Sequence, residues 1–340
     1  MPLSVLLLAQ FALLQTVLPA AAETQRLIRK DNQARVTRQL AMMGTVVDFM
    51  LVSKKTRQAN AAIDLAITEM QRIEALLTDW QDSGEIAAIN QLAAERPVQV
   101  SEETFRLLEQ AQNIAELSAG KFDISYAAAG GLWDFTTERI PIAQAIRKAL
   151  QNVDYRALIL DSEQQSVAFA KPGMRIGLGG IAKGYAVDRA VQVIKAEGYT
   201  DFAINAGGDL AIVGRKQDRL WWVGIQHPRR PDELIAVLPA SNLSIATSGD
   251  YERYFISGGK RYAHIIDPHS GYPAEQCQSV TIIAPRTFFA DAMATAVFVL
   301  GPEKGMQLIE RQPQVQGLII DQEGRLHYSS GLPHSNYLSE

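Results

Sequence analysis

Helical and strand patterns alternate irregularly along this chain, and this irregularity constrains the fold class more than any other feature. Apolar residues recur at helical spacing from Arg57 to Leu77, after a β-branched run at Val46–Val52. The middle of the chain instead carries short alternating segments around polar turns. A doubly wound parallel sheet needs regular strand–helix–strand units, which are missing here. The pattern therefore predicts an α+β fold in one continuous domain.

Further elements follow from local signals. Ser101 can cap a second helix with its hydroxyl, and Gly120 can end that helix. The alternation at Ala157–Leu160 and Ser166–Ala170 predicts a hairpin. The remaining expected elements are a helix from the glycine-rich turn at 177–184 to Glu197, a strand–turn–strand at Phe202–Val213, strands at Trp221–Ile225, Ser279–Ala284 and Gly317–Ile320, and a helix from Asp291 to about Arg311.

Composition excludes several classes of protein. The 340 residues are 47% hydrophobic and 21% charged, which is typical of a globular chain with a sizeable core. A net charge of -4 argues against a nucleic-acid surface, because phosphate backbones are held by clustered Lys and Arg. The single cysteine, Cys277, cannot form an intrachain disulfide, and we interpret it as structural.

The N-terminus has the pattern of an export signal. An apolar run from Leu3 to Leu18 ends in Pro19 and three alanines, as in a signal peptide with a cleavage site. We expect a periplasmic protein, with tethering by an uncleaved segment as the alternative. No cysteine follows the run, so a lipoprotein anchor is not expected. The predicted division is a signal peptide at 1–22, a polar segment at 23–40 and one domain at 41–335.

A glycine-rich segment, Gly177–Gly184, offers the first sign of a binding site. It places glycines and Lys183 where a loop enters a helix, so backbone N–H groups there can hold an anion. The spacing fits neither a Walker A loop nor a dinucleotide fingerprint. Tight strand-to-helix packing explains the segment equally well when it is taken alone.

Two further turns and a histidine extend the pattern. Asn205–Asp209 combines two glycines with an acid, and Ala246–Tyr251 is expected to be a third turn rich in short polar groups. Each of them could be only a hairpin. His264 follows an expected strand and precedes a proline–glycine turn, where its pKa suits proton transfer. Asp267 either orients that imidazole or caps the turn.

Asp291 and Thr295 form a candidate metal site. They lie at i and i+4 near an expected helix start, so their oxygens project from one face. Mg²⁺ accepts one or two carboxylates when substrate phosphate and water complete its shell. Asp291 could alternatively be the N-cap of the helix.

Seven ordered motifs resemble the ApbE family of flavin transferases, which move FMN from FAD onto a hydroxyl of a target protein. The resemblance covers Met43 to about Gly305. The motifs are MGT at Met43, FDIS at Phe122, GGIAKGYAVD at 179–188, NAGGDL at Asn205, ATSGDY at Ala246, HIIDPHSGYP at His264 and ADAMATA at Ala290. The resemblance implies an ApbE-like, T-fold-related single domain with mixed helices and antiparallel strands.

The resemblance also implies a set of site residues. The isoalloxazine would contact Met43 and Trp80, the phosphates would face Lys183, and the metal would be Mg²⁺. The full set implied for the FAD pocket is Met43, Trp80, Ser125, Tyr126, Ala127, Gly177, Lys183, Asp209 and Ile265. The metal would be held by Asp291, Thr295 and the backbone oxygen near Gly180, and His264 would be the base or the residue that orients the acceptor.

The sequence departs from the family at three places. Many relatives carry an aspartate at the position of Gly177, so a side-chain contact to FAD is absent or replaced there. Ala127–Gly131 lacks a proline that often follows the FDIS-like motif, and Ala294 stands where some relatives have a second acid. These differences predict a weaker metal site in which Asp291 and Thr295 remain.

The function implied is Mg²⁺-dependent transfer of FMN from FAD to a Thr or Ser of an exported or membrane-bound redox subunit, with release of AMP. Hydrolysis of FAD to FMN and AMP would use the same residues with water as the attacking group. A protein that binds FAD without chemistry is the alternative from another class. No nucleic-acid partner is expected.

Overall fold

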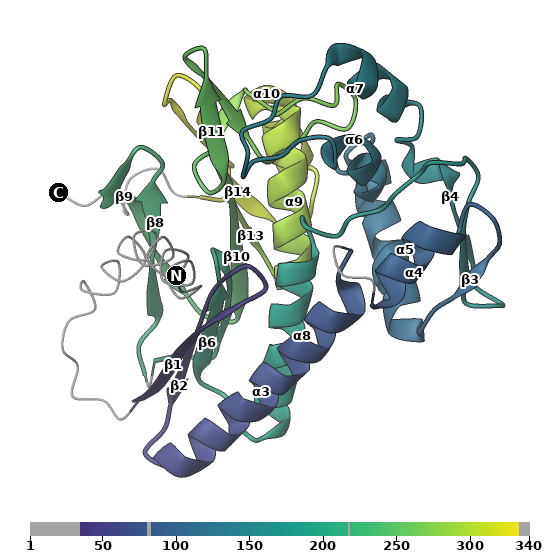
Figure 1. Ribbon diagram of the computed structural model, residues 1–340. Helices are drawn as coiled ribbons and strands as arrows, with labels where there is room; N and C mark the ends of the chain where they lie inside the picture. The colour runs from purple at the N-terminus through teal and green to yellow at the C-terminus, as the bar shows by residue number, and fades with distance from the viewer. Residues whose placement is uncertain (1–34, 80–82, 217, 333–340) are drawn as a thin grey trace, which may run out of the picture.

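The computed structural model describes residues 35–79, 83–216 and 218–332, and an eight-stranded antiparallel sheet forms its centre (Figure 1). The strand order is β1-β2-β6-β7-β10-β13-β14-β15. The strands are β1 (Arg35–Met42), β2 (Thr45–Val52), β6 (Phe202–Ala206), β7 (Asp209–Val213), β10 (Leu243–Gly249), β13 (Cys277–Ala284), β14 (Gln316–Asp321) and β15 (Leu326–Tyr328). All seven neighbouring pairs are antiparallel, so the α+β prediction is confirmed.

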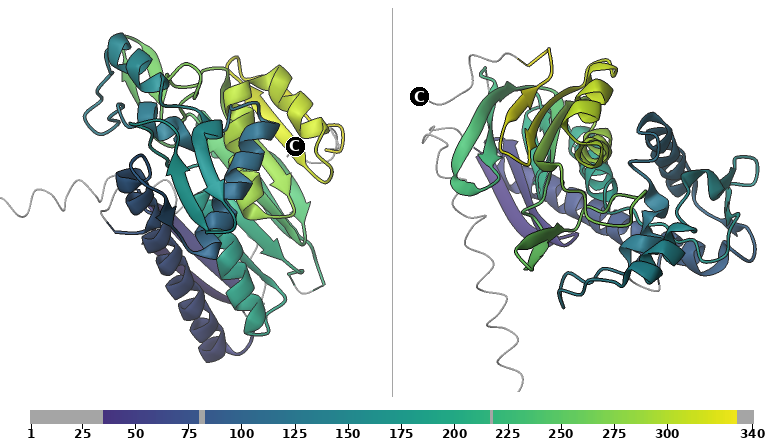
Figure 2. Two further views of the ribbon diagram at one scale, coloured as in Figure 1. Left: turned by 90° about the vertical axis from the view of Figure 1, so that its right-hand side faces the viewer. Right: turned by 90° about the horizontal axis from the view of Figure 1, so that it is seen from above.

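Helices cover one face of this sheet and a hairpin covers the other (Figure 2). The helices are α3 (Thr56–Leu77), α8 (Ala182–Ala196), α9 (Thr287–Leu300) and α10 (Pro302–Glu310), and the hairpin is β8 (Trp221–His227) with β9 (Arg230–Ala240). Strand β14 shows the alternation that this layering requires. Leu318 and Ile320 pack with the hairpin, whereas Ile319 belongs to the core beneath the helices.

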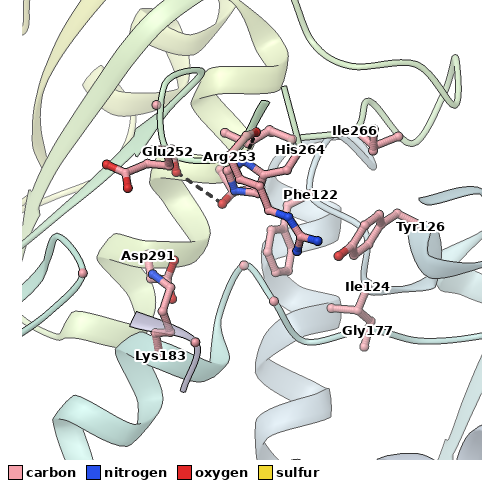
Figure 3. Close-up of a pocket in the computed structure, with 18 of the residues that line it drawn as sticks. Phe122, Ile124, Tyr126, Gly177, Lys183, Glu252, Arg253, His264, Ile266 and Asp291 are labelled. Atoms are coloured by element: carbon pink, nitrogen blue, oxygen red, sulfur yellow. Dashed lines mark hydrogen bonds between the residues drawn. The ribbon is translucent and has the colours of Figure 1, made fainter. Parts of the chain in front are cut away.

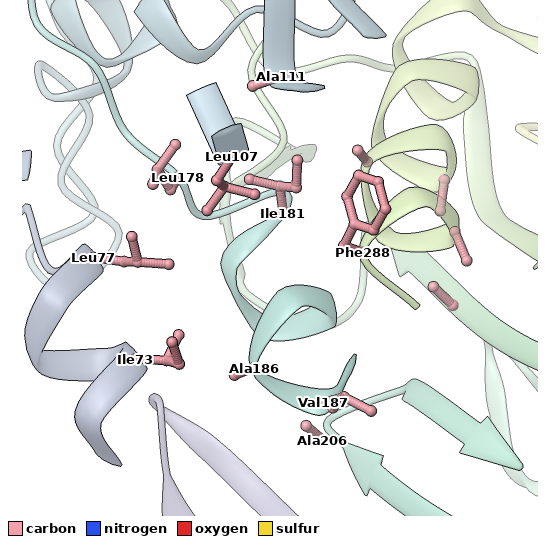
Figure 4. Packing of buried hydrophobic residues seen from close by; sticks show 14 of the residues in the cluster. Ile73, Leu77, Leu107, Ala111, Leu178, Ile181, Ala186, Val187, Ala206 and Phe288 are labelled. Atoms are coloured by element: carbon pink, nitrogen blue, oxygen red, sulfur yellow. The ribbon is translucent and has the colours of Figure 1, made fainter. Parts of the chain in front are cut away.

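A second group of elements packs beside the helices, at the right of Figure 1. It comprises α4 (Glu85–Leu92), α5 (Glu102–Leu117), α6 (Ala127–Gly130), α7 (Ala143–Leu150), the short 3-10 turns η2 (Ile124–Tyr126) and η3 (Tyr155–Ala157), and a sheet of β3 (Val98–Gln99), β5 (Ser166–Phe169) and β4 (Leu158–Asp161). Figure 4 shows the core that joins the two groups, in which Leu107 of α5, Ile73 of α3 and Ala186 of α8 belong to one cluster. Both groups therefore share one core.

The start of α5 follows its sequence signal. The Ser101 hydroxyl accepts a hydrogen bond from the Thr104 N–H at 3.2 Å, as its capping role predicts. Gly120 follows the helix at φ 78° and donates its N–H to the Ala115 carbonyl. The predicted hairpins β4–β5 and β6–β7 are also confirmed by their pairing.

Helices α8 and α9 cap each other. The Gly184 N–H in the first turn of α8 donates to Asp291 of α9 at 3.0 Å. In return, the Thr287 and Phe288 N–H groups at the start of α9 donate to Asp188 of α8. Both sets of donors lie in first helical turns and lack partners within their own helix. A Cβ at Gly184 would lie 2.6 Å from the Thr287 carbonyl oxygen, so glycine permits this close approach.

Three sequence predictions about elements are wrong. The helix expected from Asp291 to Arg311 begins at Thr287 and is two helices, which separate at Gly301 (φ 80°) and Pro302. Asp291 is therefore not an N-cap. The expected turn at Ala246–Tyr251 is instead mostly strand β10, which pairs with both β7 and β13. Its small polar residues are tolerated in a sheet centre because Ser244 and Thr247 bond to Thr287 and Thr281.

The expected domain boundary at residue 41 falls inside β1, which begins at Arg35 and pairs with β2 over its full length. The folded part thus includes residues from the predicted polar segment at 23–40. The predicted signal peptide at 1–22 lies outside the described residues. Among the residues that are described, no helix has both the length and the apolar character needed to cross a membrane.

Candidate active site

A cavity of about 380 Å³ lies where the sheet, the helix pair and the second group of elements meet (Figure 3). Segments that are far apart in the sequence line it. They are the β1–β2 turn, the segment after α5, the glycine-rich loop before α8, the β6–β7 turn, the end of β10 with the residues that follow it, the chain after β12 (Lys260–Ala263), and α9. Most of the motifs singled out in the sequence converge on this cavity.

The glycine-rich loop brings backbone close to α9. Gly179 and Gly180 line the cavity immediately before α8 begins at Ala182. A Cβ at Gly180 would lie 3.1 Å from the Thr295 hydroxyl oxygen, so the Gly180 backbone is a neighbour of that hydroxyl. The dipole of this 15-residue helix places partial positive charge beside the loop, which favours an anion, although the Ala182 and Gly184 N–H groups already donate to Leu178 and Asp291.

Lys183, Asp209 and Asp291 form a buried charge cluster, which we call the acid-rich cluster. The Lys183 ammonium forms an ion pair with Asp209, which begins β7. Burial and the nearby Asp291 charge raise the pKa of Asp209, and burial likewise raises the pKa of Asp291. Burial opposes protonation of Lys183, but the two carboxylates raise the pKa of its ammonium above the ordinary value. Two carboxyl groups therefore share one ammonium group, and the cluster has an excess negative charge when both carboxyl groups are ionised.

The donor set at this cluster fits a magnesium ion. Asp291 offers a carboxylate, Thr295 offers a hydroxyl one helical turn away, and the Gly180 backbone lies beside that hydroxyl. All are hard oxygen donors, and a divalent cation would relieve the repulsion between the two buried acids. Within residues 35–79, 83–216 and 218–332, no three His, Cys, Asp or Glu side chains gather to hold a metal, so phosphate and water oxygens would have to complete the shell.

His264 lies at the rim of the same cavity with one ring nitrogen already engaged. Its Nδ1 is 3.2 Å from the Arg253 carbonyl oxygen, which can only accept, so Nδ1 carries the proton and Nε2 is the free base. Burial, with lesser contributions from Lys183 and Arg253, lowers the pKa of His264 to about 4. The ring is consequently neutral at physiological pH. Asp267 does not orient it, because that carboxylate binds Lys121 and caps its own turn.

Away from the acid-rich cluster the lining is apolar and aromatic, with Phe122, Tyr126 and Ile266 (Figure 3). Ile265 also lines the cavity. Met43 stands at its edge in the two-residue turn between β1 and β2. Met43 and Gly44 have φ values of 53° and 70°, which match a type I′ hairpin turn. A positive φ is rare for methionine, and here the two-residue hairpin turn requires it. The Met43 N–H is fixed by Glu74 at 3.0 Å.

The structure brings most of the predicted site residues together. Nine line the cavity, and they are Met43, Tyr126, Gly177, Gly180, Lys183, His264, Ile265, Asp291 and Thr295. Three others lie behind its walls. Asp209 sits behind Lys183, Ala127 lies beside Gly177, and Ser125 is fully buried with its hydroxyl bonded to Asp123. Trp80 lies outside the described residues.

Sequence reasoning missed Arg253, Glu252 and Lys121, all of which line the cavity. A signal for Arg253 was present. Gly258–Gly259 lies between alternating residues and forms the turn of a hairpin, β11 (Tyr254–Ser257) with β12 (Lys260–Ala263). Recognising that hairpin would have placed Arg253 directly opposite His264.

Known proteins resemble this chain over most of its length. The sequence profile of the ApbE family matches residues 43–319. An FAD:protein FMN transferase of Treponema pallidum (strain Nichols) is 36% identical over 310 residues, covering 86% of each chain. Another, of Klebsiella pneumoniae (strain 342), is 31% identical over 293 residues, covering 85% of this chain and 90% of the relative. The crystal structure of the ApbE protein of Thermotoga maritima has a TM-score of 0.81 at 33% identity and covers 87% of this chain and 97% of that one.

The antiparallel sheet, the mutually capped helix pair and the acid-lined cavity, together with these relatives, define the class as a transferase. The profile match spans most of the chain, and the Treponema relative is aligned over nearly its whole length. The chain belongs to the ApbE family.

Proposed function

We propose that this chain is a magnesium-dependent FAD:protein FMN transferase, which attaches FMN through a phosphoester to a Thr or Ser of a redox protein and releases AMP. The observation that carries the proposal is the acid-rich cluster facing a glycine-rich helix start at the end of an aromatic-walled cavity. This arrangement suits a ligand with a flat apolar ring at one end and a diphosphate at the other. The relatives named FAD:protein FMN transferase support the same assignment.

The chemistry needs positioning and charge more than a protein nucleophile. The acceptor hydroxyl oxygen forms a bond to the FMN phosphorus, and the bond from that phosphorus to the bridging oxygen breaks. AMP leaves with the bridging oxygen and its electron pair. Bound Mg²⁺ would supply charge neutralisation at the diphosphate. Asp291, Thr295 and the Gly180 backbone would hold the ion, while the glycine-rich loop at the positive end of the α8 dipole would face the phosphoryl oxygens.

His264 takes the role of proton acceptor. Its neutral ring has Nδ1 held by the Arg253 carbonyl, which leaves Nε2 to accept a hydrogen bond, and then the proton, from the acceptor hydroxyl. The pKa of about 4 makes the free ring a weak base, so its first contribution is to orient the hydroxyl. The developing negative charge on the attacked phosphate favours the imidazolium as the proton moves.

The proposal includes a location and a partner. The apolar run at residues 3–18 followed by small residues has the pattern of a signal peptide, so the reaction would take place in the periplasm. The acceptor would then be an exported or membrane-bound redox subunit with an accessible Thr or Ser.

The test combines purified protein, FAD, Mg²⁺ and a candidate exported redox subunit, and measures the mass of the acceptor and the AMP released. We expect the acceptor to gain the mass of an FMN phosphoester with one AMP per event, and we expect EDTA to abolish both. AMP release without a gain in acceptor mass would instead indicate FAD hydrolysis. Binding of FAD with neither product would contradict any catalytic role.

A further inference from the structure

Three cationic side chains from the described part of the chain line the cavity, and their charges are not equally available. The Lys183 ammonium is paired with Asp209. The Lys121 ammonium lies 2.9 and 3.0 Å from the two Asp267 oxygens. Arg253 has no carboxylate within ion-pair distance among the residues described. It is therefore the one lining cation of the described chain whose charge no acid neutralises.

The position of Arg253 is fixed from two sides. Its carbonyl oxygen accepts the His264 N–H at 3.0 Å across the base of the β11–β12 hairpin. Its guanidinium carbon lies 5.6 Å from the centroid of the Phe135 ring, within the range of a cation–π contact. Figure 3 shows the guanidinium between Lys183 and Asp291 on one side and Tyr126 on the other, while Glu252 turns its carboxylate away. The charge therefore projects into the cavity.

The charge at the acid-rich cluster explains why a further cation is needed. The Lys183 ammonium already shares its charge with Asp209 and Asp291, so the cluster itself offers no uncompensated positive charge to a phosphate. The diphosphate of FAD carries two negative charges at neutral pH. Among the described lining residues, Arg253 is the cation whose charge remains available to those phosphoryl oxygens.

We propose that Arg253 is a catalytic residue whose guanidinium binds the phosphoryl oxygens of the FAD diphosphate. This inference rests on the proposed function. A guanidinium presents a planar fork of donors that matches phosphate oxygens, and stacking on Phe135 orients the fork before substrate arrives. As the bond to the bridging oxygen breaks, negative charge grows on the departing AMP phosphate, and Arg253 stabilises it by donated hydrogen bonds. Arg253 itself exchanges no proton and forms no covalent bond.

The test compares Arg253→Gln and Arg253→Lys with the wild type, using Lys260→Gln as the matched control. Lys260 lies on the same hairpin but faces solvent, where it pairs with Glu275. We expect Arg253→Gln to lower kcat/KM for FAD about 100-fold, in line with the loss of one preorganised donor group. The kcat/KM of Arg253→Lys should fall less than that of Arg253→Gln, because lysine keeps the positive charge but lacks the planar donors of the guanidinium. Lys260→Gln should stay within about threefold of the wild type, a margin below 1 kcal/mol.

A binding measurement separates the phosphate role from a structural one. Flavin fluorescence in the presence of Mg²⁺ gives the affinities for FAD and for riboflavin, which has no phosphate. We expect Arg253→Gln to weaken FAD binding about tenfold, in proportion to one charge-assisted contact, and to leave riboflavin binding unchanged. An equal loss for both ligands would indicate a distorted cavity and overturn the proposal.

Two other results would also overturn it. One is an unchanged FAD affinity together with an unchanged kcat/KM. The other is a change confined to the KM of the acceptor protein, which would place Arg253 against the acceptor. If the wild type binds FAD but transfers no FMN, the proposed function fails, and the ratio of FAD to riboflavin affinity still decides the role of Arg253.

Discussion

Two buried charge clusters lie close to strand β10 and have opposite compositions. The acid-rich cluster has two carboxylates for one ammonium. In the second, which we call the arginine-rich cluster, Asp250 is bound by both Arg229 nitrogens at 2.6 Å and approached by Arg261 at 3.9 Å. The side chains of Asp209 and Asp250 are 2% and 6% exposed, so burial alone does not distinguish the clusters.

The sign of the excess charge distinguishes their roles. In the arginine-rich cluster the carboxylate is satisfied by a bidentate guanidinium and needs no further partner. Arg229 lies in the β8–β9 turn, so the contact ties that hairpin to the end of β10. In the acid-rich cluster the carboxylates lack enough positive charge, and Asp291 faces the cavity. The first arrangement stabilises the fold, whereas the second is the one that we propose to bind a cation and phosphate.

The largest expected effect tests the acid-rich cluster. Asp291→Asn removes a proposed metal ligand, and we expect kcat/KM to fall at least about 100-fold, as for the loss of one preorganised electrostatic contact. Calorimetry should show a matching loss of Mg²⁺ affinity in the presence of FAD. The melting temperature without metal should not fall, because Asn can still accept the Gly184 N–H and no longer repels Asp209.

The control for this variant is Asp188→Asn, the same change in the other member of the mutually capped helix pair. Asp188 accepts the Thr287 and Phe288 N–H groups and is absent from the cavity lining. It should cost about 1 kcal/mol of stability as a weakened cap and leave Mg²⁺ affinity unchanged. Equal Mg²⁺ affinities for Asp291→Asn and the wild type would contradict the metal assignment.

The next effect tests the arginine-rich cluster. Asp250→Asn leaves the Arg229 guanidinium without its charge partner, and we expect a loss of about 2 kcal/mol in the free energy of unfolding. This value lies below the usual range for a broken buried pair because the Arg229 side chain is 30% exposed. Urea unfolding would measure it, with Arg230→Gln, an exposed neighbour, as the control. Weakened Mg²⁺ binding with intact stability would show that the two clusters are not functionally distinct.

The smallest expected effect concerns Asp321, a third buried acid, which accepts hydrogen bonds from Arg325 and His327. Burial opposes its ionisation, but hydrogen bonds from His327 and Arg325 lower the pKa of Asp321 to about 2. A lowered folded pKa means that this stabilisation is complete above the unfolded pKa of about 4 and is lost as pH falls towards 2. Asp321→Asn should cost about 1 kcal/mol at pH 6.

The stability gap between Asp321→Asn and the wild type should stay constant from pH 6 to 5 and narrow below pH 4. Thermal unfolding at pH 6, 5, 4 and 3 would measure it. A gap that does not change with pH would mean that Asp321 is not ionised in the folded protein or gains nothing from its charge.

Much of the fold could be predicted from local signals. The helix α3, the cap at Ser101 and the hairpins β4–β5 and β6–β7 follow from spacing and turn chemistry, which act over a few residues. The strand β10 could not be predicted, because its small polar residues are typical of a turn. They are stabilised as a strand by neighbours on both sides, β7 and β13.

The site was predictable to a similar extent. Met43, Lys183, Asp291 and Thr295 were expected together from their motifs, and the structure brings them to one cavity. The placement of Asp209 behind Lys183 depends on how the β6–β7 hairpin packs against α8, and no motif encodes it. Arg253 was missed because its role depends on a hairpin and on Phe135, which is 118 positions earlier in the sequence.

The sequence by itself determined the fold class, the glycine loop before a helix, and an acid and an alcohol one helical turn apart. These depend on backbone geometry between near neighbours. Only the tertiary structure decided which charges are balanced and which are not. Asp291 accepts its hydrogen bond from Gly184, 107 residues away, and the acid pair forms only because α8, α9 and β7 pack together. Charge excess is a property of that packing, since burial and long-range contacts set the energy of an ionised group.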